Sequence, residues 1–262
     1  MDKTATHTFV VCAYRESPYL EACIQSLLSQ TVRSQIVVST STPNASISDV
    51  CARYGLSLYI NHGEAGITGD WNFGLTLVKT PFFTIAHQDD LYDPTYTETV
   101  LGKLEREKTP ILAFTDYFEI RNGERVYKNR LLRIKRLMNF GFRLSRRWRF
   151  SRLAVLALGN SICCPAVTYS SEACRDFRFD NRFRFACDWD AWERLARKKG
   201  AFLYAPKPLM GHRIHADSET TKQTADTRRG EEEYTMFRRF WPDWIARRLS
   251  GFYAKGADSN QL

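Results

Sequence analysis

The sequence predicts an α/β protein whose mainly parallel sheet is flanked by helices. Short apolar runs alternate with helix-like segments through the first half, which is the pattern of repeated strand-helix-strand units. Runs as apolar as 36–38 and 82–86 are typical of central parallel strands that helices cover on both faces. With 262 residues, 44% of them hydrophobic, the chain can form one large domain or two modest ones with a substantial core.

The first half is expected to alternate between strands and helices. In chain order the predicted elements are strand 9–13, helix 19–29, strand 35–39, helix 46–54, strand 56–60, helix 70–78, strand 82–86, helix 94–107 and strand 111–115. Asp93 followed by Pro94 predicts a helix cap and a proline at the first helical position. The loop 88–90 therefore lies at the carboxyl end of a strand, where open α/β sheets bind ligands.

The second half is less regular. A hairpin is expected over 118–126 because Asn122-Gly123 is a strong turn signal. Apolar residues at helical spacing among arginines then predict amphipathic helices, which lie over the ligand edge of the sheet or on a surface. The remaining predicted elements are a strand over 162–169, a helix from Asp188 to Lys199 closed by Gly200, and a terminal helix from Arg228 onward.

Composition excludes several classes of protein. No apolar run approaches the roughly 20 residues that span a bilayer, so the sequence does not describe a polytopic membrane protein. The polar amino end lacks the basic region and apolar stretch of a leader, and we expect a cytosolic location. Seven cysteines, an odd number without Cys-x-x-Cys spacing, favour reduced core residues over disulfides or a zinc site.

Positive charge is concentrated in one segment. The formal net charge is +9, and eleven basic residues with no acidic residue lie between Arg125 and Arg152. Such an excess indicates an anionic partner, which could be nucleic acid, anionic lipid or a phosphorylated small molecule.

The tripeptide Gln88-Asp89-Asp90 places carboxylate oxygens at the ligand edge of the sheet. Oxygen ligands on a loop, with positions left open for water and phosphate, are what a hard divalent cation requires. Taken alone, adjacent loop aspartates are more often solvated or capping residues. Asp90 is expected on an exposed loop rather than in the core.

Five segments, taken in chain order, resemble the motifs of one enzyme family. They are FVVCAYRESPYL at 9–20 with QT at 30–31, DWNFGL at 70–75, AHQDDLY at 86–92, CDWDAWERLA at 187–196, and RIH at 213–215. Together they resemble family 2 glycosyltransferases, including that family's asparagine helix, its Asp-x-Asp loop and its Asp-Trp-Asp helix. The matches cover roughly residues 9–220, and five ordered motifs are far more specific than any one of them.

The resemblance implies a GT-A fold, in which a Rossmann-like sheet binds a nucleotide-sugar and an acceptor-binding half follows. Residues 1–220 would form this domain. Residues 1–116 would be the nucleotide-sugar half, and 117–220 the acceptor half that contains the basic segment 125–152. Residues 221–262 would be a helical C-terminal extension.

The resemblance also implies roles for individual residues. Asp188 would be the general base that takes the acceptor proton in an inverting transfer. Asp90 and His215 would hold a divalent metal, Mn²⁺ or Mg²⁺, on the donor diphosphate. The nucleotide-sugar would contact Ala13, Tyr14, Glu16, Ser39, Asp70, Asn72, Gln88 and Asp89.

Three positions depart from the family pattern. Ser39 begins a segment where the family usually has an aspartate for the nucleotide base, which leaves the donor base open. Gln88 replaces the first acid of Asp-x-Asp, and Cys187 replaces a glutamate, which leaves the ribose and acceptor contacts open. The metal ligand and the base are retained.

Each of these residues also has a plain structural interpretation. Asp188 could be a helix-start carboxylate favoured by the helix dipole, and His215 a hydrogen-bonded structural histidine. Asp70 could cap the helix that follows it, with Asn72 pinning the adjacent loop, and Tyr14 could be a core side chain.

Three functions are compatible with the sequence. The leading hypothesis is a metal-dependent, hexosyltransferase-like inverting enzyme at the cytoplasmic face of the plasma membrane. It would act on a lipid-diphosphate-linked or cell-surface glycan precursor, with 125–152 on anionic lipid, although this segment could equally be a solvated helix face. The alternative is a nucleic-acid-binding module in which Phe142, Trp148 and Phe150 stack on bases. It leaves Asp90 and Asp188 unexplained, so no nucleic acid partner is expected. The third is a GT-A homologue that binds a nucleotide-sugar without turnover, against which Asp188 argues.

Overall fold

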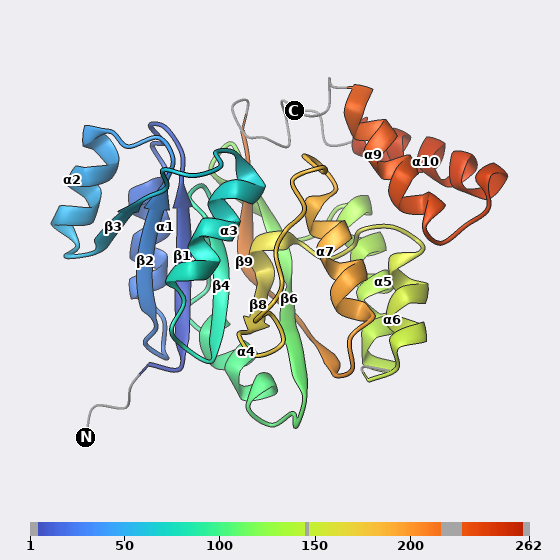
Figure 1. Cartoon of the computed structure of the whole chain (residues 1–262), viewed down its shortest axis with the longest axis horizontal. Coiled ribbons are helices and arrows are strands. Elements are labelled where there is room, and N and C mark those ends of the chain that lie inside the picture. Colours follow the sequence, from blue (N-terminus) through green and yellow to red (C-terminus); the bar gives the residue numbers. More distant parts are fainter. Residues whose placement is uncertain (1–4, 145–146, 216–226, 259–262) are drawn as a thin grey trace.

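A single mixed sheet forms the centre of the molecule (Figure 1). The computed structural model describes residues 5–144, 147–215 and 227–258. The strands are β1 (His7–Ala13), β2 (Gln35–Thr40), β3 (Ser57–Ile60), β4 (Phe82–His87), β5 (Leu91–Tyr92), β6 (Pro110–Arg121), β7 (Glu124–Val126), β8 (Val167–Ser170) and β9 (Ala201–Ile214). Their order across the sheet is β3-β2-β1-β4-β8-β6-β9-β5, and β7 pairs with β6.

The sheet is parallel over most of its length. The pairs β1–β2, β1–β4, β2–β3 and β6–β9 are parallel, whereas β5, β7 and β8 run antiparallel to their neighbours. Since β8 is antiparallel to both β4 and β6, strands β1, β4, β6 and β9 share one direction. Their carboxyl ends therefore meet at one edge. The α/β prediction with a mainly parallel sheet is confirmed.

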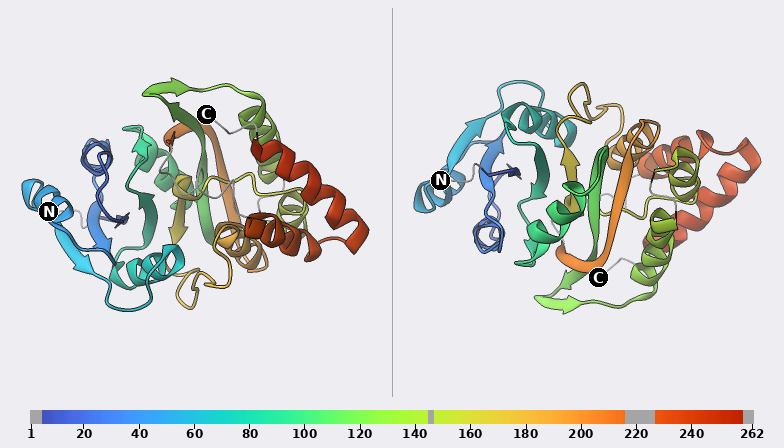
Figure 2. Two further views of the ribbon diagram at one scale, coloured as in Figure 1. Left: turned by 90° about the horizontal axis from the view of Figure 1, so that it is seen from above. Right: turned by 90° about the horizontal axis from the view of Figure 1, so that it is seen from below.

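Helices cover both faces of the sheet (Figure 2). They are α1 (Leu20–Leu28), α2 (Ala45–Arg53), α3 (Ile67–Leu77), α4 (Tyr96–Leu104), α5 (Arg130–Leu144), α6 (Arg149–Leu156), α7 (Cys187–Ala196), α9 (Thr227–Arg238) and α10 (Asp243–Asp258), with a 3-10 turn η1 (Cys164–Ala166) before β8. Successive strand residues point to opposite faces, which divides the core in two. On β6, Leu112 and Phe114 join the cluster under α3 and α7, while Ala113 joins the one under α1 and α4.

Several predicted boundaries differ from the structure. The strand 111–115 and the first half of the hairpin are one continuous strand, β6, because β9 pairs along its whole length through a bulge near Thr115. The turn itself is confirmed, since Asn122 and Gly123 both have positive φ, 50° and 84°. α4 begins at Tyr96 rather than Pro94, and the Asp93 carboxylate accepts a hydrogen bond from the Thr95 amide at 2.9 Å.

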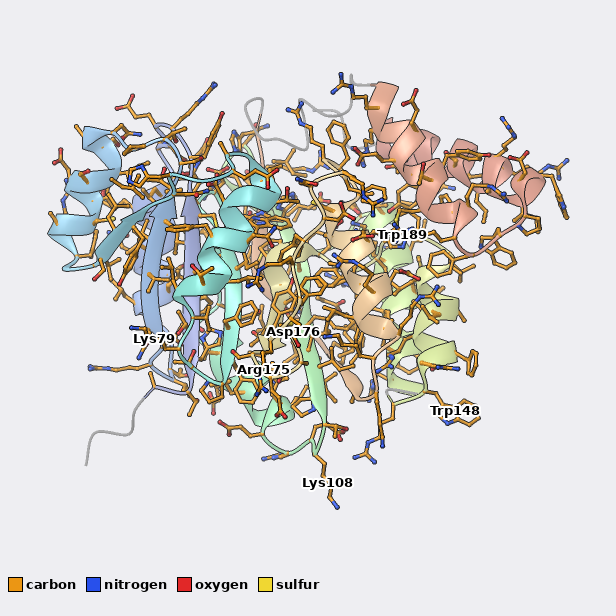
Figure 3. The ribbon with its side chains drawn as sticks, in the orientation of Figure 1. Lys79, Lys108, Trp148, Arg175, Asp176 and Trp189 are labelled. Atoms are coloured by element: carbon orange, nitrogen blue, oxygen red, sulfur yellow. The ribbon has the colours of Figure 1, made fainter. Side chains whose placement is uncertain are left out.

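The C-terminal part contains two helices where one was expected. Figure 3 shows Trp189 of α7 pointing toward them. Its indole contacts Phe237 of α9 at 4.9 Å and Tyr253 of α10 at 5.8 Å between ring centroids. The extension therefore packs directly on α7, and residues 216–226 and 259–262 of the predicted segments lie outside the described residues. In the described part of the chain, no helix is long and apolar enough to cross a bilayer.

Candidate active site

Asp90 lies at the carboxyl edge of the sheet and is buried, with 1% of its surface exposed. Its Oδ1 accepts hydrogen bonds from the Arg213 amide at 2.9 Å and from His212 Nδ1 at 3.2 Å. Burial raises the pKa of this carboxyl, but His212, His87 and the Arg213 amide together outweigh burial and lower the pKa below its usual value. The expectation that Asp90 is exposed on its loop is wrong, because His212 and Arg213 of β9 pack against its side chain.

Asp89 and His215 face each other beside Asp90. The Asp89 carboxylate accepts a hydrogen bond from Ser17 Oγ at 2.8 Å, and its other oxygen lies 3.4 Å from His215 Nε2. Arg213 Nε donates to the Asp89 carbonyl at 2.9 Å, and the guanidinium lies 4.3 Å from the centre of the Tyr19 ring. The Arg-Ile-His end of β9 is thus bound to the acidic loop.

Gln88 forms two hydrogen bonds with the backbone of Tyr14. Its Oε1 accepts from the Tyr14 amide at 3.0 Å and its Nε2 donates to the Tyr14 carbonyl at 2.9 Å. The Tyr14 ring is 40% exposed and lies under the Arg15 guanidinium, so a core role for Tyr14 is wrong. Glu16 is exposed on the same loop and Ala13 is buried at the end of β1.

Asp70 joins two loops to helix α3 from a buried position. Its two oxygens accept from Ser41 Oγ and Asn61 Nδ2, each at 2.8 Å. Helix α3 begins at Ile67, so Asp70 lies in its first turn and the prediction of a helix cap is wrong. Ser39 is buried, and its hydroxyl contacts Cys12 Sγ at 3.8 Å. Ser41 and Asn61 carried no sequence signal of their own.

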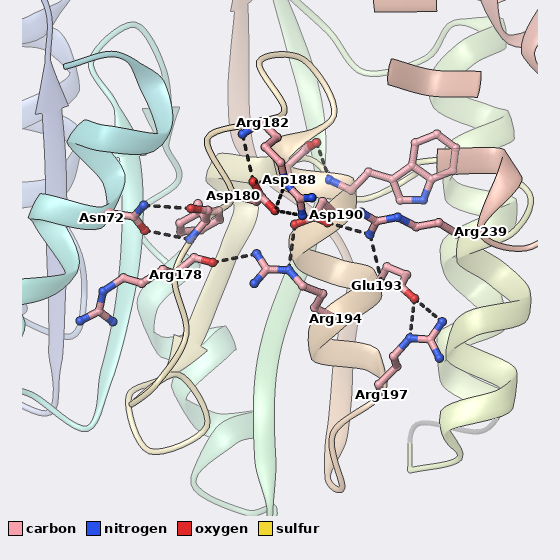
Figure 4. Close-up of polar contacts among 12 residues, drawn as sticks. Asn72, Arg178, Asp180, Arg182, Asp188, Asp190, Glu193, Arg194, Arg197 and Arg239 are labelled. Atoms are coloured by element: carbon pink, nitrogen blue, oxygen red, sulfur yellow. Dashed lines mark hydrogen bonds and ion pairs between the residues drawn. The ribbon is translucent and has the colours of Figure 1, made fainter. Parts of the chain in front are cut away.

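Asp188 is the second residue of α7 and is partly buried. Its Oδ2 accepts from Asn160 Nδ2 at 2.8 Å and its Oδ1 from the Trp189 amide at 2.6 Å. Burial raises the pKa of Asp188 above its usual value, although both hydrogen bonds oppose the change. Asp190, two positions on, is fully buried and paired with Arg194 of the same helix at 2.8 Å and with Arg239, just after α9, at 2.7 Å (Figure 4).

The two acidic centres share a pair of cysteine neighbours. Burial raises the pKa values of the Cys163 and Cys164 thiols, and the charges of both Asp90 and Asp188 raise them further. These thiols therefore lie within electrostatic reach of both carboxylates. Lys135 of α5, which sequence reasoning missed, adds positive charge that lowers the pKa of Asp188.

The residues at this edge suit a hard divalent cation. Asp90 Oδ2 and His215 Nε2 are buried and have no hydrogen-bond partner in the structure. The carboxylate oxygen is a ligand that Mn²⁺ and Mg²⁺ prefer, whereas imidazole nitrogen is more typical of Zn²⁺, Fe²⁺ or Ni²⁺ sites. The described ranges contain no group of three or more His, Cys, Asp or Glu arranged to hold a metal. Further ligands would therefore have to come from water or a bound diphosphate.

The basic segment 125–152 has two kinds of cation. Arg152 is 1% exposed and donates to the carbonyls of Ala196 and Lys198, each at 2.8 Å, and to that of Gly200, all at the C-terminal end of α7. Among the described arginines of this segment, six are exposed, namely Arg125, Arg130, Arg133, Arg143, Arg147 and Arg149, and Arg136 is partly buried. The segment is therefore neither a uniform solvated face nor a uniform binding surface.

Residues 8–175 match the family described as Glycosyl transferase family 2. The chain belongs to this family. The GT-A expectation is thereby confirmed together with the fold.

Curated relatives named as glycosyltransferases match this chain at low identity. The chain is 26% identical over 125 residues to glycosyltransferase GlyA of Streptococcus pneumoniae, covering 46% of this chain and 18% of that protein. An uncharacterized glycosyltransferase of Rickettsia bellii is 26% identical over 226 residues, 83% of this chain and 31% of that protein. The chain thus spans less than a third of the length of these two relatives.

Solved structures share the fold. The mannosyltransferase PcManGT of Pyrobaculum calidifontis, in complex with GDP-Man and Mn²⁺, superposes with a TM-score of 0.68 at 13% identity, covering 98% of this chain and 74% of that one. S. aureus TarS residues 1–349, in complex with UDP-GlcNAc, gives a TM-score of 0.63 at 13% identity, covering 94% and 70%.

Proposed function

We propose that this family 2 domain transfers a sugar, with inversion, from a nucleoside diphosphate sugar to an acceptor hydroxyl. The observation that carries the proposal is that two carboxylates, both within electrostatic reach of Cys163 and Cys164, have opposite pKa shifts. Asp90 has a lowered pKa and stays ionised, whereas Asp188 has a raised pKa, which suits proton uptake. The nucleotide-sugars bound to the two solved neighbours support this donor class.

In this proposal the two carboxylates have separate tasks. Asp188 accepts the proton of the acceptor hydroxyl as that oxygen attacks the anomeric carbon. Asp90 and His215 would hold the divalent metal, which when bound supplies positive charge to the departing diphosphate. The Tyr14 ring and Glu16 lie exposed beside the acidic loop, where they would contact the nucleotide.

A binding and turnover experiment tests this function. UDP and GDP are screened by thermal shift with and without MnCl₂, and a nucleotide that binds the native state raises the melting temperature. Release of the nucleoside diphosphate from its sugar donors is then measured for Asp188→Asn. We expect unchanged donor binding and turnover lower by about 10²–10⁴-fold. The exposed Asp176→Asn serves as the matched control, and normal turnover in Asp188→Asn would reject the base assignment.

We also propose that the acceptor is lipid-linked and that the protein works at the cytoplasmic face of the plasma membrane. The strongest support is the set of exposed apolar side chains on α5 and around the start of α6. Leu137 is 77% exposed, Trp148 73% and Phe150 69%, and Figure 3 shows Trp148 pointing away from the body of the protein. Arg149 lies 4.8 Å from the Phe150 ring centre. Exposed aromatic side chains among arginines suit an anionic bilayer surface.

Vesicle flotation tests the membrane assignment. Vesicles with about 30% phosphatidylglycerol should retain the protein, and retention should weaken with salt because exposed charges are screened. The double variant Trp148→Ser/Phe150→Ser should lose most of this retention. Tyr59→Ser, an exposed aromatic on the opposite edge strand β3, is the control. Equal binding to neutral vesicles, or tighter retention on single-stranded RNA, would contradict the proposal.

A further inference from the structure

The loop between α6 and η1 is held by aromatic side chains of the C-terminal part. Trp241 Nε1 donates to the Ala157 carbonyl at 2.7 Å. The Tyr253 hydroxyl accepts from the Asn160 amide at 3.2 Å and donates to the Asn160 carbonyl at 3.1 Å. One tyrosine of α10 thus satisfies both backbone groups of a single loop residue.

The Tyr253 ring is itself fixed in place. It packs on Gly159, whose φ is +135°, and a Cβ at that position would lie 2.7 Å from the ring. Only glycine accepts both this backbone conformation and this close approach without strain. The ring also stacks on Trp189 of α7 and contacts Phe237 of α9.

Asn160 connects this loop to the candidate base. Its Nδ2 donates to Asp188 Oδ2, while the other Asp188 oxygen is held by the Trp189 amide. With one donor on each oxygen, the carboxylate has a fixed orientation. A donor of this kind also favours the ionised carboxylate.

The α9 helix acts on the same end of α7. Glu232 accepts hydrogen bonds from three consecutive backbone amides just before the helix, those of Arg184 at 2.9 Å, Phe185 at 2.7 Å and Ala186 at 3.0 Å. The start of the helix that carries Asp188 is therefore held from two sides by the C-terminal helices.

We propose that Asn160 is a positioning residue for Asp188 and that Tyr253 of α10 holds Asn160 in place. The C-terminal helices α9 and α10 then contribute to catalysis, because they hold the residues that orient Asp188. The inference rests on the proposed function, in which Asp188 is the base. It adds two residues that none of the family motifs in this chain contains.

The surroundings of Asp188 make its titration a sensitive probe. In the described part of the chain, the titratable side chains within electrostatic reach include Lys135, Cys163, Cys164, Tyr169, Cys187 and Tyr253. Among them only Lys135 carries a positive charge at neutral pH. Loss of the Asn160 donor should therefore raise the Asp188 pKa further, because Asn160 is the largest of the contributions that oppose burial there.

The test is a ¹³C NMR titration of the full chain labelled in its aspartate carboxyl carbons, with the Asp188 signal assigned by its loss in Asp188→Asn. In Asn160→Ala we expect its pKa to rise by about one unit, as for a lost hydrogen bond to a charged group. Tyr253→Phe, which keeps the packed ring, should shift it in the same direction by less. The double variant should match Asn160→Ala alone, since Tyr253 acts through Asn160.

The control is Tyr234→Phe, which removes a tyrosine hydroxyl of α9 that bonds Asp243 at the surface. An unchanged Asp188 titration in both Asn160→Ala and Tyr253→Phe, or shifts that add in the double variant, would overturn the inference. If Asn160→Ala fails to fold, Tyr253→Phe alone decides the outcome. Normal turnover in Asp188→Asn would instead reject the proposed function and leave the NMR result standing.

Discussion

The side-chain amide of Asn72 and the backbone of Phe179 form a closed pair of hydrogen bonds. Asn72 Nδ2 donates to the Phe179 carbonyl at 2.9 Å, and the Phe179 amide donates to Asn72 Oδ1 at 2.8 Å (Figure 4). The residues are 107 positions apart. The pair joins α3 to the segment that leads into α7, so the expectation that Asn72 pins a loop adjacent in sequence is wrong.

Asn72→Ala should therefore affect stability more than nucleotide binding. Both Phe179 backbone groups lose their partner, and the free energy of unfolding should fall by about 1–3 kcal/mol. Urea unfolding measures this change. Asn181→Ala, which removes an exposed contact with Glu64, should change it by less than about 0.5 kcal/mol. If Asn72→Ala were fully stable but lost most of its nucleotide affinity, the result would instead support the prediction that Asn72 contacts the nucleotide-sugar.

Asp90→Asn should remove metal-dependent nucleotide binding while keeping the fold. The amide preserves the side-chain shape but lacks the charge that a divalent cation needs, so Mn²⁺-dependent UDP or GDP affinity should fall at least about tenfold, a loss of about 1.4 kcal/mol. Titration calorimetry with and without Mn²⁺ measures this. Asp90→Ala is the poorer test, because it also strips buried partners from His212 and Arg213. Unchanged affinity in Asp90→Asn would show that another residue holds the metal.

Arg152→Met should destabilise the protein, and Arg149→Met should not. Arg152 is buried, which lowers its pKa to about 10, and it satisfies three carbonyls at the C-terminal end of α7. Leaving them unpaired should cost about 2–4 kcal/mol in urea unfolding, while the exposed Arg149 should cost under about 0.5 kcal/mol. In contrast, Arg149→Met should weaken binding to anionic vesicles, and Arg152→Met should not. Equal stability of the two variants would contradict the division of the basic segment.

The stability of the fold should fall with acid through His7. This imidazole is fully buried between Ser34 Oγ at 2.9 Å and Thr84 Oγ1 at 3.0 Å, and burial lowers its pKa to about 3. Between about pH 6.5 and pH 3 only the unfolded chain binds the proton, so the free energy of unfolding should decrease by up to about 1.4 kcal/mol per pH unit as the pH falls.

Urea unfolding at several pH values measures this slope. His7→Asn should flatten it relative to the unsubstituted protein, whereas the exposed His62→Asn should leave it unchanged. If His7→Asn and the unsubstituted protein lose stability in parallel, His7 is protonated in the native state.

Local pattern was enough to predict most elements and the position of the candidate site. Strand and helix periodicity are properties of neighbouring residues, and the acidic loop had to follow a strand because helix α4 comes soon after it. Ordered motifs then predicted the family, which the match over 8–175 confirms. Local pattern could not predict that two expected strands form the single strand β6. Pairing with β9 makes this strand continuous, and β9 lies some 80 residues further along the chain.

The sequence by itself determined which chemical groups this protein brings to the sheet edge, namely two loop carboxylates, the Arg-Ile-His strand and an acidic helix start. The tertiary structure alone decided the protonation and the orientation of these groups. Asp90 is buried and ionised because His212 and Arg213 reach it from β9, and Asp188 is oriented because Asn160 contacts it from another loop. Burial and hydrogen-bond partners set a carboxyl pKa, and both come from residues distant in the chain that only folding brings together.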